Sequence, residues 1–282
     1  MENITDETTW EDSHLQDYWD WYRQGKDLDD QGCYAQAIAS YEKALECRPH
    51  DYWSWYHRGN MLYAMGDYEE ALNSFDKAQE IRGSDYWAWY SRGCIALEEM
   101  DAFKEACDSF DRALEIRPDD YWSWYRRGDA LRHLGEYEAA IASYTNALEI
   151  KGNDYWVYYR LGDTLRHLER YEEAVASYDK ALQIKSRDYW IWYRRGDALR
   201  HLGEYEAAIA SYDEALKLDP QDSYAHYNKA CCAAKQGKRQ LALASLTEAI
   251  QLNPSENLTL AQTDPDLVSL RDDKFFHSLI DN

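Results

Sequence analysis

The residues best suited to chemistry are three histidines, each directly after an arginine, that recur at a spacing of 34. They are His133, His167 and His201. A zinc site needs its nitrogen ligands about 2.0–2.1 Å from the metal. If the histidines stand on equivalent helices of successive repeats, those helices lie about 8–10 Å apart. The three side chains then cannot share one metal, and we expect neither a metal nor another cofactor.

Other candidates for catalysis are no better placed. The six cysteines show no CxxC spacing, and most fall at small or apolar positions of a helical pattern, as reduced packing thiols do. The sequence contains no glycine-rich phosphate loop and no HExxH, GxSxG or DxDxDG motif. Carboxylates such as Glu138 occupy outward helix positions, where a solvated charge is the ordinary outcome. We therefore do not expect an enzyme.

The element that must position these side chains is a segment repeated along the chain. Its clearest copy is Asp-Tyr-Trp-Ser-Trp-Tyr-Arg-Arg-Gly at 120–128. Its aspartate recurs in steps of 34, with one step of 35, as Asp17, Asp51, Asp85, Asp120, Asp154, Asp188 and Asp222. A fixed period of this length indicates a repeat architecture, so the 282 residues are a stack of units that share a continuous core.

Each unit is predicted to be a helical hairpin. In the fourth copy Asp120 is placed to cap a helix that runs to about Leu134, because its carboxylate can accept from free backbone N–H groups. Gly135 breaks the chain, and apolar spacings of three and four predict a second helix over 137–150. This pattern resembles the tetratricopeptide repeat (TPR) family through Trp124, Gly128, Leu131, Gly135, Tyr137, Ala140, Tyr144 and Ala147. The resemblance implies an all-α fold, a right-handed α-solenoid of seven helix-turn-helix TPR hairpins with a C-terminal capping helix.

The repeats also set the predicted domain boundaries. Residues 1–16 are an acidic N-terminal lead-in or a poorly formed helix, and residues 255–282 are a C-terminal capping segment. Between them, 17–254 hold seven tandem repeats: 18–51, 52–85, 86–120, 121–154, 155–188, 189–222 and 223–254.

Two repeats depart from the pattern. The third has one extra residue somewhere between Gly93 and Ala106 and lacks the turn glycine, which leaves the register of Glu98 and Glu99 open. The seventh has a histidine and an alanine where the others have the second tryptophan and the first glycine, and it carries a net charge of plus 3. We interpret it as a transition toward the end cap.

The first helix of each repeat can be sorted by direction, since each residue turns the helix by about 100°. With Trp122 at zero, Trp124 and Leu131 point to the opposite half with the family's packing residues. The TPR resemblance implies that the side bearing Trp122 lines a concave groove that contacts extended peptides. Carried over by position, the predicted aromatic groove residues are Trp19, Tyr22, Trp53, Tyr56, Trp87, Tyr90, Trp122, Tyr125, Trp156, Tyr159, Trp190, Tyr193 and Tyr227. Alternatively, these rings stack along and between the first helices and stiffen the solenoid.

Repeats four to six share one polar set on that side. Its members are Arg126, Asp129, Arg132, His133, Arg160, Asp163, Arg166, His167, Arg194, Asp197, Arg200 and His201. The guanidinium groups could bind carboxylates or phosphates of a ligand. The set could also satisfy itself, because each aspartate lies three or four residues from two arginines and a histidine of its own helix.

Charge narrows the choice of partner. The net charge is minus 22, of which residues 1–120 carry minus 17 and residues 121–254 only minus 1. Such a field repels phosphate backbones and anionic lipids, so nucleic acid is unlikely as a partner and membrane insertion is not expected. A partner segment would be basic toward repeats one to three and acidic toward repeats four to six.

Together these features predict a non-enzymatic protein–protein interaction scaffold that binds an extended polypeptide in an aromatic-lined concave groove. Two alternatives stay open. The same groove could take a carbohydrate, an aromatic small molecule or a single-stranded nucleic acid, or the chain could form a homo-oligomer through the groove or the solenoid ends. No run of 18 apolar residues occurs, and the prediction is a cytoplasmic protein.

Overall fold

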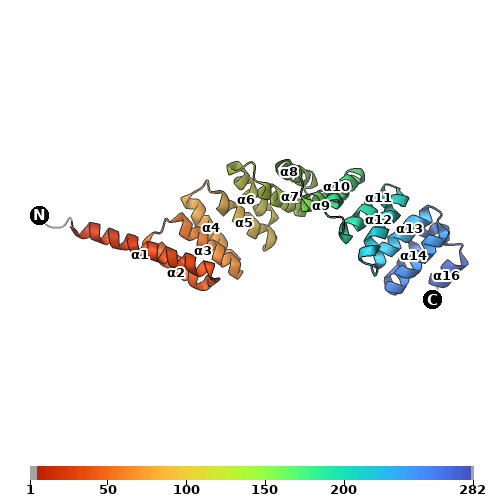
Figure 1. Cartoon of the computed structure of the whole chain (residues 1–282), viewed down its shortest axis with the longest axis horizontal. Coiled ribbons are helices and arrows are strands. Elements are labelled where there is room, and N and C mark those ends of the chain that lie inside the picture. Colours follow the sequence, from red (N-terminus) through yellow and green to blue (C-terminus); the bar gives the residue numbers. More distant parts are fainter. Residues whose placement is uncertain (1–4, 281–282) are drawn as a thin grey trace. The chain divides into compact units, whose positions relative to one another are not determined.

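The computed structural model describes the backbone of residues 5–280 and the side chains of residues 15–280. Within that range the chain forms sixteen α-helices and one 3-10 helix, and no strand. It divides into two compact units, residues 1–136 and residues 137–282, which are described separately (Figure 1). The all-α fold predicted from the sequence is confirmed.

The first unit consists of helices that pack in consecutive pairs. They are α1 (Thr5–Asp30), α2 (Tyr34–Cys47), α3 (Tyr52–Met65), α4 (Tyr68–Ile81), α5 (Tyr86–Glu98), α6 (Phe103–Ile116) and α7 (Tyr121–Leu134). The predicted lead-in, 1–16, lies partly outside the described residues, and its residues 5–16 belong to α1. The first helix of the first hairpin is therefore longer than its counterparts.

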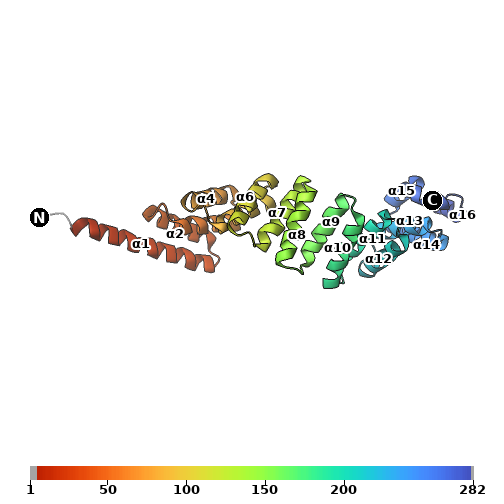
Figure 2. The ribbon, with the colours of Figure 1, turned by 90° about the horizontal axis from the view of Figure 1, so that it is seen from above.

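The second unit continues the pattern and ends in three shorter elements. Its helices are α8 (Tyr137–Ile150), α9 (Tyr155–His167), α10 (Tyr171–Ile184), α11 (Tyr189–His201), α12 (Tyr205–Leu218), α13 (Ser223–Lys235), α14 (Arg239–Leu252), α15 (Pro254–Thr263), the 3-10 helix η1 (Pro265–Leu270) and α16 (Lys274–Ile280). Figure 2 shows α9 with α10, α11 with α12 and α13 with α14 as adjacent pairs.

Aspartates begin the first helices as predicted. The side chain of Asp120 accepts from the Ser123 backbone N–H at 2.7 Å, and Asp222 accepts from Ala225 at 2.9 Å. These bonds satisfy donors that a helix N-terminus leaves free. Gly135 ends α7 in the left-handed conformation, with φ of 79°.

The third hairpin shows where its extra residue lies. In the regular turn the Glu136 N–H donates to Leu131, five residues earlier, whereas in the third hairpin the Ala102 N–H donates to Ala96, six residues earlier. Asp101 takes the left-handed place of the missing glycine, with φ of 50°. The insertion is therefore in the turn, and Glu98, the last residue of α5, keeps the helical register of the other repeats.

Small residues allow close approach of the paired helices. A Cβ added to Gly162 of α9 would lie 2.7 Å from a ring carbon of Tyr178 in α10, and Gly196 of α11 has the same relation to Tyr212 of α12. Both tyrosines are fully buried. Glycine is thus required at this position because an aromatic ring of the partner helix fills the space of a side chain.

Candidate functional site

The first tryptophan of each Asp-Tyr-Trp segment is exposed. The six side chains retain between 41% and 58% of their accessible surface, although the residues on either side of them are largely buried. They are Trp19, Trp53, Trp87 and Trp122 in the first unit, and Trp156 and Trp190 in the second. We call the side of the first helices that bears these residues the indole face, and describe it within each unit.

Each exposed indole is held by tyrosines of its own helix. The ring of Trp156 meets Tyr155 edge to face at 5.0 Å and Tyr159 at 6.5 Å, with interplanar angles of 77° and 78°. Trp190 has the same arrangement with Tyr189 and Tyr193. These contacts fix the orientation of the indole without covering it. Among the described residues, the ring partners of Trp156 and Trp190 lie within their own helices, which is not the contact between repeats that stiffening requires.

The second tryptophan of the motif has a different role. The indole N–H of Trp192 donates to the carbonyl of Ser186 at 2.9 Å, and that of Trp124 donates to the carbonyl of Pro118 at 2.8 Å. Both side chains are half-buried. This tryptophan therefore fixes the loop that enters the repeat, as its predicted direction away from Trp122 indicates.

The tyrosine between aspartate and tryptophan joins neighbouring repeats. The hydroxyl of Tyr155 donates to Asp188, the cap of the next first helix, and Tyr189 donates to Asp222 in the same way. The Lys185 ammonium also donates to Asp188 at 2.9 Å. Although burial opposes it, these bonds hold the pKa of Asp188 below its usual value. Sequence reasoning found the caps but missed this link, whose only signal is the constant step from each tyrosine to the next aspartate.

The polar set of the second unit is paired within itself. Asp163 is 3.2 Å from Arg166 of its own helix and 3.8 Å from Arg194 of the next first helix. Arg166 also lies 3.9 Å from Asp197, which pairs with Arg200 at 3.2 Å. Asp163 is buried. The arginines and aspartates thus form a ladder within and between repeats, and a ligand carboxylate would have to share these guanidinium groups.

The first unit shows related pairs. Arg132 lies 4.0 Å from the buried Asp129, and Arg126 pairs with Glu98 of the preceding repeat. Glu98 also accepts from the hydroxyl of Tyr63 at 3.4 Å. The open question of the Glu98 register is thereby answered, because its carboxylate reaches the first helices of both neighbouring repeats.

The three histidines lie far from any shared metal position. Each stacks on an aromatic ring that begins the second helix of the preceding repeat: His133 on Phe103 at 4.6 Å, His167 on Tyr137 at 5.2 Å and His201 on Tyr171 at 4.7 Å. The interplanar angles are between 4° and 14°. Their visible role is packing between repeats.

The tyrosines predicted to line the groove are only partly open. Tyr22, Tyr56, Tyr90, Tyr125, Tyr159 and Tyr193 are half-buried. The ring of Tyr193, for example, contacts Tyr212 of its own hairpin at 5.9 Å. Tyr227 was predicted to line an open groove, and the structure contradicts this: it is 5% exposed and its hydroxyl donates to Asp264 at 3.0 Å. The C-terminal segment covers it.

One group among the described residues offers three potential metal donors close together. The ligand atoms of Cys231, Asp264 and Asp266 lie within 4.8 Å of one another. Lys235 and Arg200 already pair with Asp266 at 3.1 and 3.5 Å. Burial, with Asp264 nearby, raises the pKa of the Cys231 thiol. Two cations and a protonated thiol fit an ion-pair network better than a metal site.

A membrane-crossing helix would need both length and an apolar composition. None of the helices within the described part of the chain has the two together.

Comparison with family sequence models gives consistent matches. Models described as tetratricopeptide repeat or TPR repeat match residues 25–66, 52–85, 119–187, 189–222 and 223–256, well over half of the chain. A model of the protein prenyltransferase alpha subunit repeat matches residues 103–134. No curated protein matches the chain.

Solved structures of similar fold are TPR proteins of low sequence identity. YrrB, described as a TPR protein with an unusual peptide-binding site, has a TM-score of 0.62 at 22% identity, over 68% of this chain and 100% of its own. The C-terminal part of a TPR repeat-containing protein from Cytophaga hutchinsonii has a TM-score of 0.71 at 16% identity, over 88% and 99%. MamA from Desulfovibrio magneticus has 0.57 at 20%, over 61% and 96%. At these identities the likeness concerns the fold alone.

Proposed function

We propose, since the chain belongs to the tetratricopeptide repeat family, that its helical hairpins are a protein-interaction scaffold that holds an extended segment of another protein on the indole face. The observation that carries this proposal is the exposure of the six indoles at one position of successive repeats. Large exposed apolar side chains in a row mark an interaction surface more often than a requirement of folding. The peptide-binding site described for YrrB supports the same class of ligand.

The energetics favour an extended ligand. Association costs about 4–15 kcal/mol, and burial of one aromatic or aliphatic anchor returns about 1.5–3 kcal/mol. One indole cannot meet that cost, so several repeats must act together. Because the indoles are held by Tyr155, Tyr159 and their equivalents, little side-chain entropy is lost when a ligand covers them.

The charge of the partner segment is proposed from the charge of the repeats. Residues 1–120 carry minus 17, which favours a basic segment beside repeats one to three. Toward repeats four to six the arginines favour carboxylates, although Asp163 and Asp197 already take part of each guanidinium. We therefore place the stronger charge selection at the N-terminal repeats.

A pair of adjacent tryptophans separates the binding role from the structural one. We expect Trp156→Ala with Trp190→Ala to abolish capture of partners from native lysate, while the helical signal and the melting temperature persist. The control is Trp192→Phe, which removes the bond to Ser186 and leaves both exposed indoles in place. It should lower the melting temperature and retain capture. Full capture by the double variant would refute the indole face as the site.

The exposed indoles also favour a second candidate, a carbohydrate, because sugar rings pack on aromatic faces. Titration of the tryptophan fluorescence with oligosaccharides tests this class directly. Saturable quenching that disappears in Trp156→Ala with Trp190→Ala would favour a sugar over a polypeptide. Light scattering across protein concentration reports separately on self-association.

A further inference from the structure

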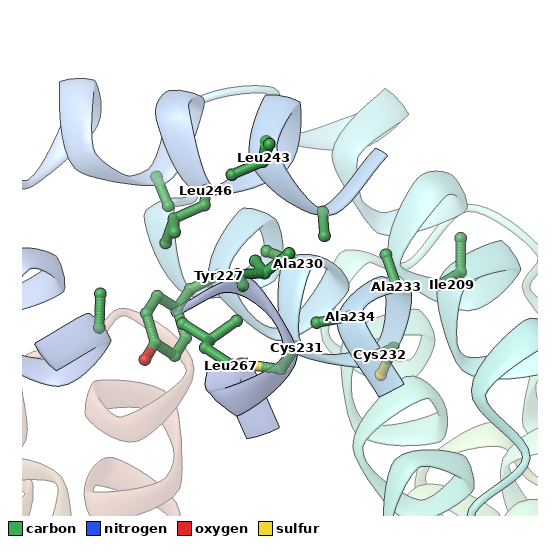
Figure 3. Close-up of a cluster of buried hydrophobic side chains, with 14 of the residues drawn as sticks. Ile209, Tyr227, Ala230, Cys231, Cys232, Ala233, Ala234, Leu243, Leu246 and Leu267 are labelled. Carbon is green, nitrogen blue, oxygen red and sulfur yellow. The ribbon is translucent and has the colours of Figure 1, made fainter. Parts of the chain in front are cut away.

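The C-terminal segment lies on the continuation of the indole face. The 3-10 helix η1 packs on α13, the first helix of the seventh repeat. Figure 3 shows Leu267 of η1 beside Tyr227 and Cys231, on the side of α13 away from Leu243 and Leu246 of α14. Leu267 and Leu270 are buried there. A stretch of this chain thus occupies a surface that the other first helices leave open.

One carboxylate of this segment completes the arginine–aspartate ladder. The aspartate position of repeats four to six, last seen at Asp197, is occupied in repeat seven by Cys231. Arg166 pairs with its own aspartate and with that of the next repeat. Arg200 pairs with its own Asp197 and then, at 3.5 Å, with Asp266 of η1. Asp266 therefore supplies from outside the repeats the charge that the seventh repeat lacks.

The rest of the segment matches the surface of α13 by shape and charge. Asp264 accepts from the hydroxyl of Tyr227 at 3.0 Å, and Lys235 lies 3.1 Å from Asp266. The ladder arginine position, occupied by Arg200 in repeat six, is Ala234 in repeat seven. A small side chain there leaves room for the leucines of η1, which an arginine would fill.

We propose that the α13 surface, together with Arg200, is a binding site for an acidic, leucine-containing segment of a partner protein, and that residues 264–270 are its displaceable internal occupant. The pattern is two carboxylates two residues apart, with leucines one and four residues after the second. This site is separate from the exposed indoles, so the loss or survival of capture by the tryptophan variants does not decide it.

Displacement requires only a short element to move. The cover is the six-residue η1, and its outer side is open, with Val268 57% exposed. The flanking helices have anchors of their own: Asn257 and Ala261 of α15 and Phe276 of α16 are buried, and Arg239 of α14 pairs with Asp273. Loss of the η1 contacts therefore leaves α15 and α16 attached.

Native thiols report whether the cover is in place. In the wild-type chain we expect alkylation of Cys231, which is 3% exposed, to be far slower than that of the exposed Cys33. Leu267→Asp should raise the Cys231 rate toward that of Cys33 and leave the buried Cys107 unchanged. The matched control is Val268→Asp, which adds the same charge on the outer side and should leave Cys231 protected. If circular dichroism shows that Leu267→Asp unfolds, Asp266→Lys, which faces Arg200 and Lys235, replaces it.

A synthetic peptide of residues 262–272 then tests the site itself. We expect it to bind the uncovered variant with one-to-one stoichiometry and to restore protection of Cys231. It should bind the wild type far more weakly, because the tethered segment competes at an effective concentration of roughly millimolar order. A peptide with asparagine in place of both aspartates should bind the uncovered variant at least about tenfold more weakly, since each lost charged hydrogen bond weakens affinity.

Three results would overturn the proposal. One is continued protection of Cys231 in a folded variant with the cover residues changed. Another is a peptide that neither binds nor restores protection, which would make η1 a permanent cap. The third is protection restored only in dimers, seen by light scattering, which would make a second copy the occupant.

Discussion

At the residue scale, His57 shows how a polar side chain is kept neutral inside an aromatic cluster. It stands in α3 at the position that arginine occupies in repeats four to six. Its ring stacks on Tyr41 at 5.5 Å and on Trp53 at 5.9 Å. Burial, with a smaller contribution from Lys26, lowers the pKa of His57 to about 4.

This depressed pKa predicts an acid sensitivity of the first unit. Between pH 6.5 and 4 the unfolded chain binds a proton at His57 that the folded chain does not, so the free energy of unfolding falls as pH falls. We expect wild type to lose roughly 1–3 kcal/mol more than His57→Phe between pH 7.5 and 4.5, measured by urea unfolding. Phenylalanine keeps the ring contacts and cannot titrate. Parallel pH profiles of the two proteins would contradict the assignment.

At the element scale, a hairpin is held by a glycine in the first helix and a ring in the second. The pairs Gly162 with Tyr178 and Gly196 with Tyr212 bring the backbone of one helix against the aromatic face of its partner. The hairpin geometry therefore depends on the absence of a single methyl group.

Alanine scanning of glycines tests this dependence. Gly162→Ala places a Cβ 2.7 Å from a buried ring carbon of Tyr178 and should cost about 1–3 kcal/mol of stability through overpacking. Gly152→Ala is the matched control, because a Cβ there meets only the carbonyl oxygen of Leu148 at 3.7 Å, an ordinary contact. Thermal unfolding compares the two. Equal melting temperatures would show that α9 and α10 can separate without loss.

At the scale of the whole molecule, charge is divided unequally along the chain. Residues 1–120 carry minus 17 and residues 121–254 carry minus 1, although both form hairpins of the same kind. In repeat proteins each unit is stabilised mainly by its neighbours, so local self-repulsion weakens the repeats that bear it.

Salt should therefore stabilise the two parts of the chain unequally. We expect amide hydrogen exchange in α2–α6 to slow markedly when ionic strength rises from low values to about 0.15 M, because screening reduces repulsion between carboxylates. Exchange in α9–α14 should change little. A uniform response, or faster exchange in α2–α6, would mean that ion pairs such as Arg58 with Glu42 outweigh the net repulsion.

Much of this architecture could be predicted because it is written in local patterns. The helix from 137 to 150 and the end of α7 at Leu134 agree with the predicted bounds, since capping, turn glycines and apolar periodicity act within a few residues. The exposed side of the tryptophans likewise follows from helix geometry. The pairing of the arginine set could be posed but not answered, because each guanidinium chooses between carboxylates in different repeats.

The sequence by itself determined the period, the hairpins, the family and the direction in which each indole points, because these depend on spacing along one helix. Only the tertiary structure decided which of those side chains remain open. It covered Tyr227 with Asp264 and Leu267, joined Tyr155 to Asp188, and brought Asp266 to Arg200. Each of these contacts joins residues more than thirty positions apart, where no local pattern specifies which groups meet.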